Sequence, residues 1–173
     1  KVFLLREDQG IFYDTYWYGG SYGAITYGFV YYWLAQYIPG PIFVTFASGL
    51  IPLFFYLYQR GTWRTDDIWP SWLFVVILCF YQANGQDPFV VALCLSLGGL
   101  ALLATRRRVL AALLVGTGIF ANPMALFVVG VLLLADFAGR REVRRDYLVF
   151  AAWLVPFVLA RVAIGLAFGE PSA

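Results

Sequence analysis

The chain has 173 residues, of which 62% are hydrophobic, 20% aromatic and only 13% charged, whereas an ordinary soluble domain is roughly 25% charged. This composition, with long apolar runs between basic or turn-rich loops, excludes an ordinary soluble protein and predicts an all-α, polytopic transmembrane helical bundle. The net charge of +2 carries little information, because the charges are segregated into loops. The absence of histidine argues against haem ligation, and the short membrane-flanking basic clusters give no support for nucleic-acid binding.

The first 40 residues are predicted to form an outer-face loop that leads into an interfacial aromatic helix. The segment Tyr22–Ile38 is apolar but rich in tyrosine, a residue that favours the headgroup level of a bilayer. The chain begins at Lys1 and shows no signal-peptide pattern there. We therefore expect it to be either trimmed or a piece of a longer protein.

Residues 41–168 are predicted to form the transmembrane helices of a single membrane domain that spans residues 1–173. A bilayer core about 30 Å thick is crossed by about 20 apolar residues in a helix. Four runs fit this length, some of them barely: Pro41–Tyr58, Ile68–Ala83, Pro88–Thr105 and Tyr147–Phe168. The longest apolar stretch, Val109–Ala138, is interrupted near its middle by Asn122 and Pro123.

Basic clusters on both sides of this longest stretch predict that it folds back on itself. They are Arg106, Arg107 and Arg108 before it, and Arg140, Arg141, Arg144 and Arg145 after it. The positive-inside rule assigns both clusters to the cytoplasm, which one straight span would prevent. We expect two arms of about 21 Å each that meet at Asn122–Pro123 as a hairpin or re-entrant pair, with the tip in a protein-lined or wet cavity. The total is about five to seven membrane segments.

We expect an integral, multi-pass protein of a prokaryotic plasma membrane, and the same rule orients the rest of the chain. Arg60 and Arg64 make the loop after Tyr58 cytoplasmic. The chain then crosses outward, and the segment "ANGQDPF", Ala83 to Phe89, lies on the outer side together with the Asn122 tip.

The outer segment contains one polar residue with a predicted structural role and two candidates for ligand binding. Asp87 is predicted to cap the helix whose first turn contains Pro88. Asn84 and Gln86 have no evident structural duty. We expect these two side chains to contact a polar ligand.

We predict structural roles for the small residues within the apolar spans. Cys79 and Cys94 have no CxxC spacing or histidine partner, so we expect neither a disulfide nor a zinc site and interpret both as small core residues. Gly98 and Gly99 stand side by side in one span and predict close helix packing.

Two stretches of the chain resemble the GT-C class of polyprenyl-phosphate-sugar-dependent glycosyltransferases. The first is "DQGIFY", Asp8 to Tyr13, followed by "YGGSY" and "TYGFVYYWL". The second runs from "NGQDPF" to "ANPMAL". The first stretch is similar to the acidic first outer loop of this class and the aromatic segment that follows it. The second is similar to a Gly-Gln pair followed by an apolar helix, a basic turn and a short helix that ends before a proline. Asn122 stands where members often carry lysine.

This resemblance implies sugar transfer from a polyprenyl-phosphate donor at the outer face. Asp8 is then the catalytic acid or base and Asp14 a second catalytic candidate, because a carboxylate accepts the proton of an attacking hydroxyl. Arg161 is the intramembrane cation available to the leaving phosphate. The remaining candidates for substrate contacts are Glu7, Tyr13, Asn84, Gln86 and Asn122. Carboxylates suit Mg or Mn, but no residue pattern defines a metal site.

Two other classes of function remain open on the sequence. The broken Asn122–Pro123 helix pair is also typical of small-solute transporters, which use half-helix ends near the midplane. The short length also suits a non-catalytic scaffold subunit of a larger membrane complex. Membrane lipid is a partner in every case, and other membrane subunits are partners in the last.

Overall fold

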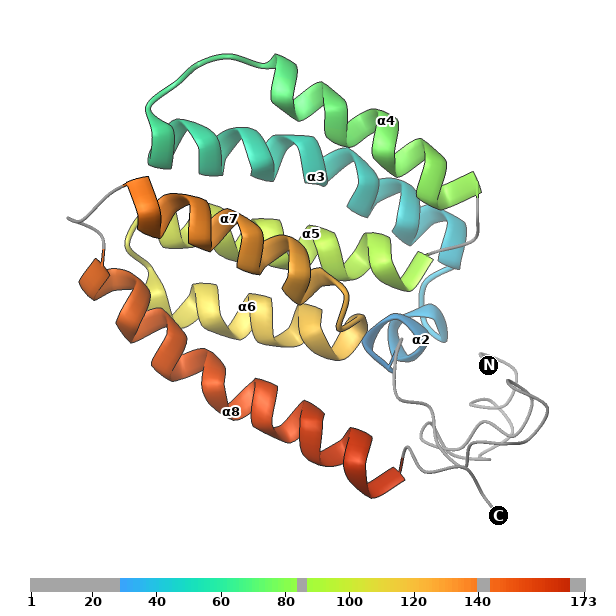
Figure 1. The fold of residues 1–173 in the computed structure, drawn as a ribbon. Helices are drawn as coiled ribbons and strands as arrows, with labels where there is room; N and C mark the ends of the chain where they lie inside the picture. The colour runs from blue at the N-terminus through green and yellow to red at the C-terminus, as the bar shows by residue number, and fades with distance from the viewer. Residues whose placement is uncertain (1–28, 84–86, 140–143, 169–173) are drawn as a thin grey trace.

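The computed structural model describes residues 29–83, 87–139 and 144–168 (Figure 1). Every regular element in these ranges is an α-helix, which confirms the predicted fold class. The helices are α2 (Phe29–Ala35), α3 (Gly40–Trp63), α4 (Trp69–Ala83), α5 (Asp87–Ala104), α6 (Arg108–Ala121), α7 (Ala125–Gly139) and α8 (Arg144–Phe168).

Three of these helices are long and apolar enough to cross a bilayer. They cover Gly40–Trp63, Asp87–Ala104 and Arg145–Ile164, and three shorter apolar helices cover Trp69–Phe80, Arg108–Ala121 and Ala125–Phe137. Large hydrophobic side chains are exposed on the outside of the bundle, among them Trp72, Phe127 and Leu159. Because water would oppose such exposure, the chain is an integral membrane protein with several membrane segments.

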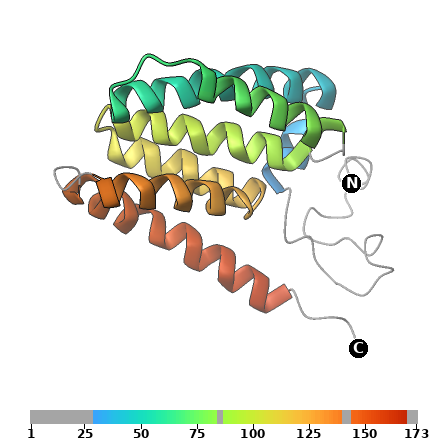
Figure 2. The ribbon, with the colours of Figure 1, turned by 45° about the horizontal axis from the view of Figure 1, so that its top comes forward.

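Helices α3 to α8 alternate in direction, so that the loops gather at two ends of the bundle (Figures 1 and 2). One end holds α2, which contacts α5 and α6, and is called the α2 end. The opposite end holds the loops with Arg64, Arg106 and Arg107 and is called the arginine end. α6 and α8 lie side by side and run in the same direction toward the α2 end.

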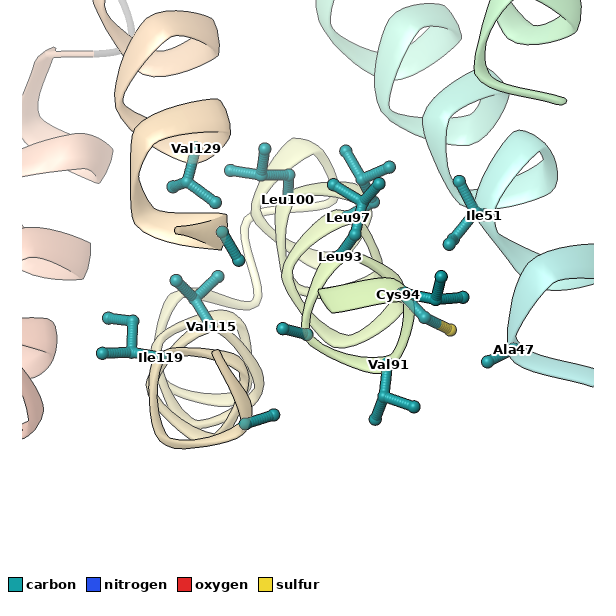
Figure 3. Close-up of a cluster of buried hydrophobic side chains, with 14 of the residues drawn as sticks. Ala47, Ile51, Val91, Leu93, Cys94, Leu97, Leu100, Val115, Ile119 and Val129 are labelled. Atoms are coloured by element: carbon teal, nitrogen blue, oxygen red, sulfur yellow. The ribbon is translucent and has the colours of Figure 1, made fainter. Parts of the chain in front are cut away.

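The helix α5 forms the centre of the bundle. Its span is 72% buried, and α3, α6 and α7 pack around it. Figure 3 shows Leu93, Leu97 and Leu100 of α5 among side chains of these neighbours. A central membrane helix is surrounded by other helices, so it is apolar on all sides.

Glycines allow α5 and α6 to approach closely, as predicted for Gly99. A Cβ atom added to Gly99 would lie 2.6 Å from Cγ2 of Val115 and 2.8 Å from the backbone oxygen of Ala111. A Cβ atom added to Gly118 would lie 2.6 Å from Oγ of Ser96. Small residues at such contacts bring backbones together and increase van der Waals packing.

The predicted break at Asn122–Pro123 is confirmed, because α6 ends at Ala121 and α7 begins at Ala125. The two arms nevertheless make few contacts with each other. α6 packs chiefly on α5 and α8, and α7 lies mainly against α5. The ring of Phe157 on α8 covers Gly116, so the second face of α6 is occupied by α8 instead of α7.

Two sequence expectations need correction. The aromatic helix predicted over Tyr22–Ile38 ends at Ala35 in its described part, and residues 36–38 form a turn. Pro39 follows that turn, and a proline disfavours helical backbone in the residue before it. Cys94 is buried as predicted, but Cys79 is exposed on α4, because α4 contacts the bundle along one side only.

Candidate functional site

Tyr31 connects three helices at the α2 end. Its buried ring stacks on Phe43 of α3, with the ring centroids 6.4 Å apart. The hydroxyl donates a hydrogen bond of 3.1 Å to Oδ2 of Asp87 at the start of α5. A Cβ atom added to Gly40 would lie 3.0 Å from this hydroxyl, so the absence of a side chain there admits the tyrosine. One side chain thus joins α2, α3 and α5.

Pro88 lies in the first turn of α5, as expected from the sequence, whereas Asp87, predicted as the cap before the helix, is itself the first helical residue. An acidic side chain there is stabilised by the positive end of the helix dipole, and proline fits the first turn because no intrahelical donor is needed. The neighbouring candidates Asn84 and Gln86 lie outside the described residues. The described polar group of this segment is therefore the carboxylate that accepts from Tyr31.

Asn122 has a structural hydrogen bond that the sequence did not indicate. Its side-chain Oδ1 accepts a hydrogen bond of 3.0 Å from the backbone N–H of Met124, and its own N–H donates to the oxygen of Gly118 over 2.9 Å. The side chain thereby caps the start of α7 while the backbone extends the end of α6. Asn122 is buried, with 9% of its surface exposed, and its two hydrogen bonds hold the backbone on both sides of the break.

Arg161 lies half-buried on α8, one helical turn beyond Phe157. The Phe157 ring packs edge to face on Phe120 of α6, with centroids 6.5 Å apart. The Nε atom of Arg161 is buried and makes no hydrogen bond with the described residues. An unsatisfied buried donor costs free energy in an apolar environment, so this cation is not explained by packing alone.

The structure therefore brings part of the predicted site to one end of the bundle. Two of the predicted site residues lie toward the α2 end: Asn122 directly follows α6, and Arg161 lies in the last two turns of α8. Asp87, which was predicted to be a helix cap, begins α5 at the same end. Six other predicted site residues lie outside the described residues: Glu7, Asp8, Tyr13, Asp14, Asn84 and Gln86.

A second polar cluster, not predicted from the sequence, lies near the arginine end around Asp136 of α7. The Asp136 carboxylate is 1% exposed and accepts hydrogen bonds from three aromatic side chains. Tyr58 and Tyr147 both donate to Oδ2, over 2.6 Å and 2.5 Å, and Trp63 donates through Nε1 to Oδ1 over 2.7 Å. These donors come from α3 and α8, so the carboxylate ties three helices together.

The sequence does contain a weak signal for this cluster. Asp136 is an acid within an otherwise apolar run, one turn before a basic cluster. An acidic residue inside a membrane helix is expensive unless it has partners. Which partners it takes depends on how α3, α7 and α8 pack, and the sequence spacing does not give that.

Ion pairs close the arginine end. Arg108 at the start of α6 pairs with Asp146 in the first turn of α8, and Arg106 lies 3.9 Å from the same carboxylate. Arg60 pairs with Asp66 over 3.1 Å, with both side chains largely exposed. Of these three pairs, only Arg108–Asp146 has both side chains partly shielded from solvent, so it contributes more to stability than the exposed pairs.

No group of three or more Asp, Glu, Cys or His side chains that would hold a metal occurs within the described ranges. No protein-family model, no curated protein and no solved structure matches the chain.

Proposed function

We propose that the chain is a GT-C-like membrane glycosyltransferase that uses a polyprenyl-phosphate sugar donor at the α2 end. The hydrogen bond between Tyr31 and Asp87 carries this proposal. Tyr31 belongs to "TYGFVYYWL" and Asp87 to "NGQDPF", the two stretches on which the resemblance to this class rests. They are 56 residues apart in the sequence, and the bond joins them directly.

Asn122 and Arg161 support the same location. Both come to the end of the bundle that holds Tyr31 and Asp87. Arg161 is a cation in a membrane helix, and such residues mark functional sites by default. Its buried Nε has no described acceptor, so a phosphate oxygen would satisfy it.

The proposed reaction is a single displacement at the anomeric carbon. Asp8 takes the proton of the acceptor hydroxyl as its oxygen forms the new bond to that carbon. The bond from the carbon to the phosphate oxygen breaks, and polyprenyl phosphate leaves with the electron pair. Arg161 stabilises the charge that develops on this phosphate. Asp14 is the second catalytic candidate, and Glu7, Tyr13, Asn84 and Gln86 contact the sugars.

A turnover assay tests the proposal. The purified full chain in liposomes is supplied with undecaprenyl-phosphate-linked mannose, glucose or arabinose and a panel of octyl glycoside acceptors. Release of undecaprenyl phosphate and formation of the glycosylated acceptor are then measured by mass spectrometry. We expect both with at least one donor and acceptor pair, and loss of both in Asp8→Asn.

The control is Asp66→Asn, which changes an exposed acid at the opposite end and should keep full turnover. Turnover that survives in Asp8→Asn contradicts the assignment of the base. Absence of transfer with all three donors contradicts the proposed function itself.

A second candidate is a non-catalytic subunit of a larger membrane complex, and the surface of α8 favours it. Only 11% of the span of α8 is buried, and it carries exposed Trp153, Leu159 and Leu166. Such a face suits partner helices as well as lipid. Purification in a mild detergent distinguishes the two, because a subunit is recovered with stoichiometric partner chains and an independent enzyme is not.

A further inference from the structure

An apolar groove runs along the bundle between α3 and α6, with α5 as its floor. It consists of two cavities of about 250 and about 380 Å³ that share Phe54, Gly98 and Leu114. Figure 3 shows Val91 and Cys94 of α5 on the side away from Val129 of α7, so the groove opens on the face that α7 leaves uncovered.

The dimensions of the groove suit a hydrocarbon chain. On α3 the lining extends from Phe43 to Leu57, a distance of about 21 Å at about 1.5 Å per helical residue. Half of a bilayer core measures about 15 Å. The lining is apolar except for Thr105, whose hydroxyl already donates to the oxygen of Leu102 over 2.9 Å.

Three arginines belong to the two loops at the end of the groove that Thr105 marks. Arg106 and Arg107 follow Thr105. Arg64 is the C-cap residue of α3, two helical turns beyond Leu57. The ends of α3 and α5 lie close together, because a Cβ atom added to Gly61 would lie 2.8 Å from Cβ of Ala104. All three arginines are exposed. Arg64 and Arg107 form no ion pair with the described residues, and Arg106, whose side chain is 82% exposed, lies 3.9 Å from Asp146 of α8.

Two of these arginines occupy backbone positions where glycine would be less strained. Arg64 and Arg106 have φ angles of 55° and 63°, and no other non-glycine residue in the described ranges has a positive φ. Arg106 stands at the glycine position of a Schellman motif: its N–H donates to Leu103 O over 2.9 Å, and that of Arg107 to Leu102 O over 3.0 Å.

Membrane orientation alone does not account for this placement. The positive-inside rule depends on the number of arginines in a loop and not on their backbone conformation. A left-handed conformation costs a non-glycine residue free energy, and such strained residues cluster at active sites and ligand clamps. Both strained residues flank the same end of one apolar groove, so the cations and the groove point to a single ligand.

We propose that this groove binds an acyl chain of an anionic phospholipid, whose phosphate is held by Arg64, Arg106 and Arg107. The guanidinium group matches phosphate geometry and donates two parallel hydrogen bonds. With the arginine end in the cytoplasm, as the positive-inside rule predicts, the lipid comes from the leaflet rich in anionic headgroups. This inference is independent of whether the protein transfers sugars.

Lipid titration of the purified, delipidated full chain in detergent tests the proposal. The thermal unfolding midpoint is followed as dioleoylphosphatidylglycerol, dioleoylphosphatidylcholine or undecaprenyl phosphate is added. Phosphatidylglycerol should raise the midpoint in a saturable way and phosphatidylcholine should not. Arg106→Gly should keep or raise the midpoint without lipid, because it relieves the left-handed backbone, yet weaken phosphatidylglycerol binding by roughly fivefold. Arg64→Gly should behave in the same way.

A charge-matched control and a blocked groove complete the test. Arg145→Gln removes an exposed arginine of α8 from the same end and should leave the affinity unchanged. Gly98→Leu should fill the groove, since even a Cβ atom there lies 3.2 Å from the Phe54 ring, and abolish the lipid-induced shift. If that variant does not fold, Leu102→Trp blocks the groove from a partly exposed position.

Three results would overturn the proposal. They are equal shifts with phosphatidylcholine, equal weakening by Arg145→Gln and Arg106→Gly, and a shift with undecaprenyl phosphate in the absence of one with phosphatidylglycerol.

Discussion

Trp63 of α3 and Asp136 of α7 are joined by a 2.7 Å hydrogen bond across 73 residues of sequence. The bond belongs to a buried cluster in which Tyr58 and Tyr147 donate to the other oxygen of the same carboxylate. Hydrogen bonds to a charged acceptor are stronger than neutral ones. Three such bonds compensate the desolvation of the acid and fix α3, α7 and α8 relative to one another near the arginine end.

Removal of the acceptor should therefore destabilise the fold. Asp136→Ala leaves three donors without their acceptor, and we expect a loss of about 3 kcal/mol, or roughly 6 to 12 °C in the unfolding midpoint. Asp66→Ala, which removes an exposed paired acid, should cost less than about 1 kcal/mol. Calorimetry in detergent measures both. Equal unfolding midpoints for the two variants would show that the cluster around Asp136 does not stabilise the fold.

The close approach of α5 and α6 predicts a strong difference between two glycine substitutions. Gly99→Ala places a Cβ atom 2.6 Å from Val115 and should destabilise by about 1 to 3 kcal/mol through overpacking. Gly130→Ala in α7 meets nothing within 4 Å and should be neutral or stabilising, because alanine favours helix. Thermal unfolding of both variants checks this, and a tolerated Gly99→Ala would refute the close contact.

The bond between Tyr31 and Asp87 predicts an energetic coupling between these residues. In a double-mutant cycle with Tyr31→Phe and Asp87→Ala, we expect a coupling free energy of about 1 kcal/mol. Loss of either partner should also speed amide hydrogen exchange in α2, since the bond attaches α2 to the start of α5. Additive effects in the cycle would mean that the two side chains do not interact.

Arg161 should matter more for activity than for stability. Its buried Nε has no partner among the described residues, so Arg161→Met should change the free energy of unfolding by no more than about 1 kcal/mol. Under the proposed function, the same variant should lose sugar transfer, and Arg161→Lys should retain part of it because the charge remains. A large loss of stability in Arg161→Met would instead assign the arginine a structural role.

The helical elements follow from the sequence because they depend on local properties. Apolar runs of membrane length predicted the helices, and Asn122–Pro123 marked the break because proline cannot continue a helix hydrogen-bond ladder. Gly99 signalled close packing through the absence of a side chain. Each of these features depends on residues within a few positions of one another, so no knowledge of the packing was needed.

Only the tertiary structure decided which helices share which faces. α6 packs on α8, where the absence of a side chain at Gly116 admits the ring of Phe157, and it makes little contact with its chain neighbour α7. The same packing brings Tyr58 and Trp63 to Asp136, Tyr31 to Asp87, and the two left-handed arginines to one end of a groove. These pairings join positions far apart in the chain, where composition and periodicity impose no register.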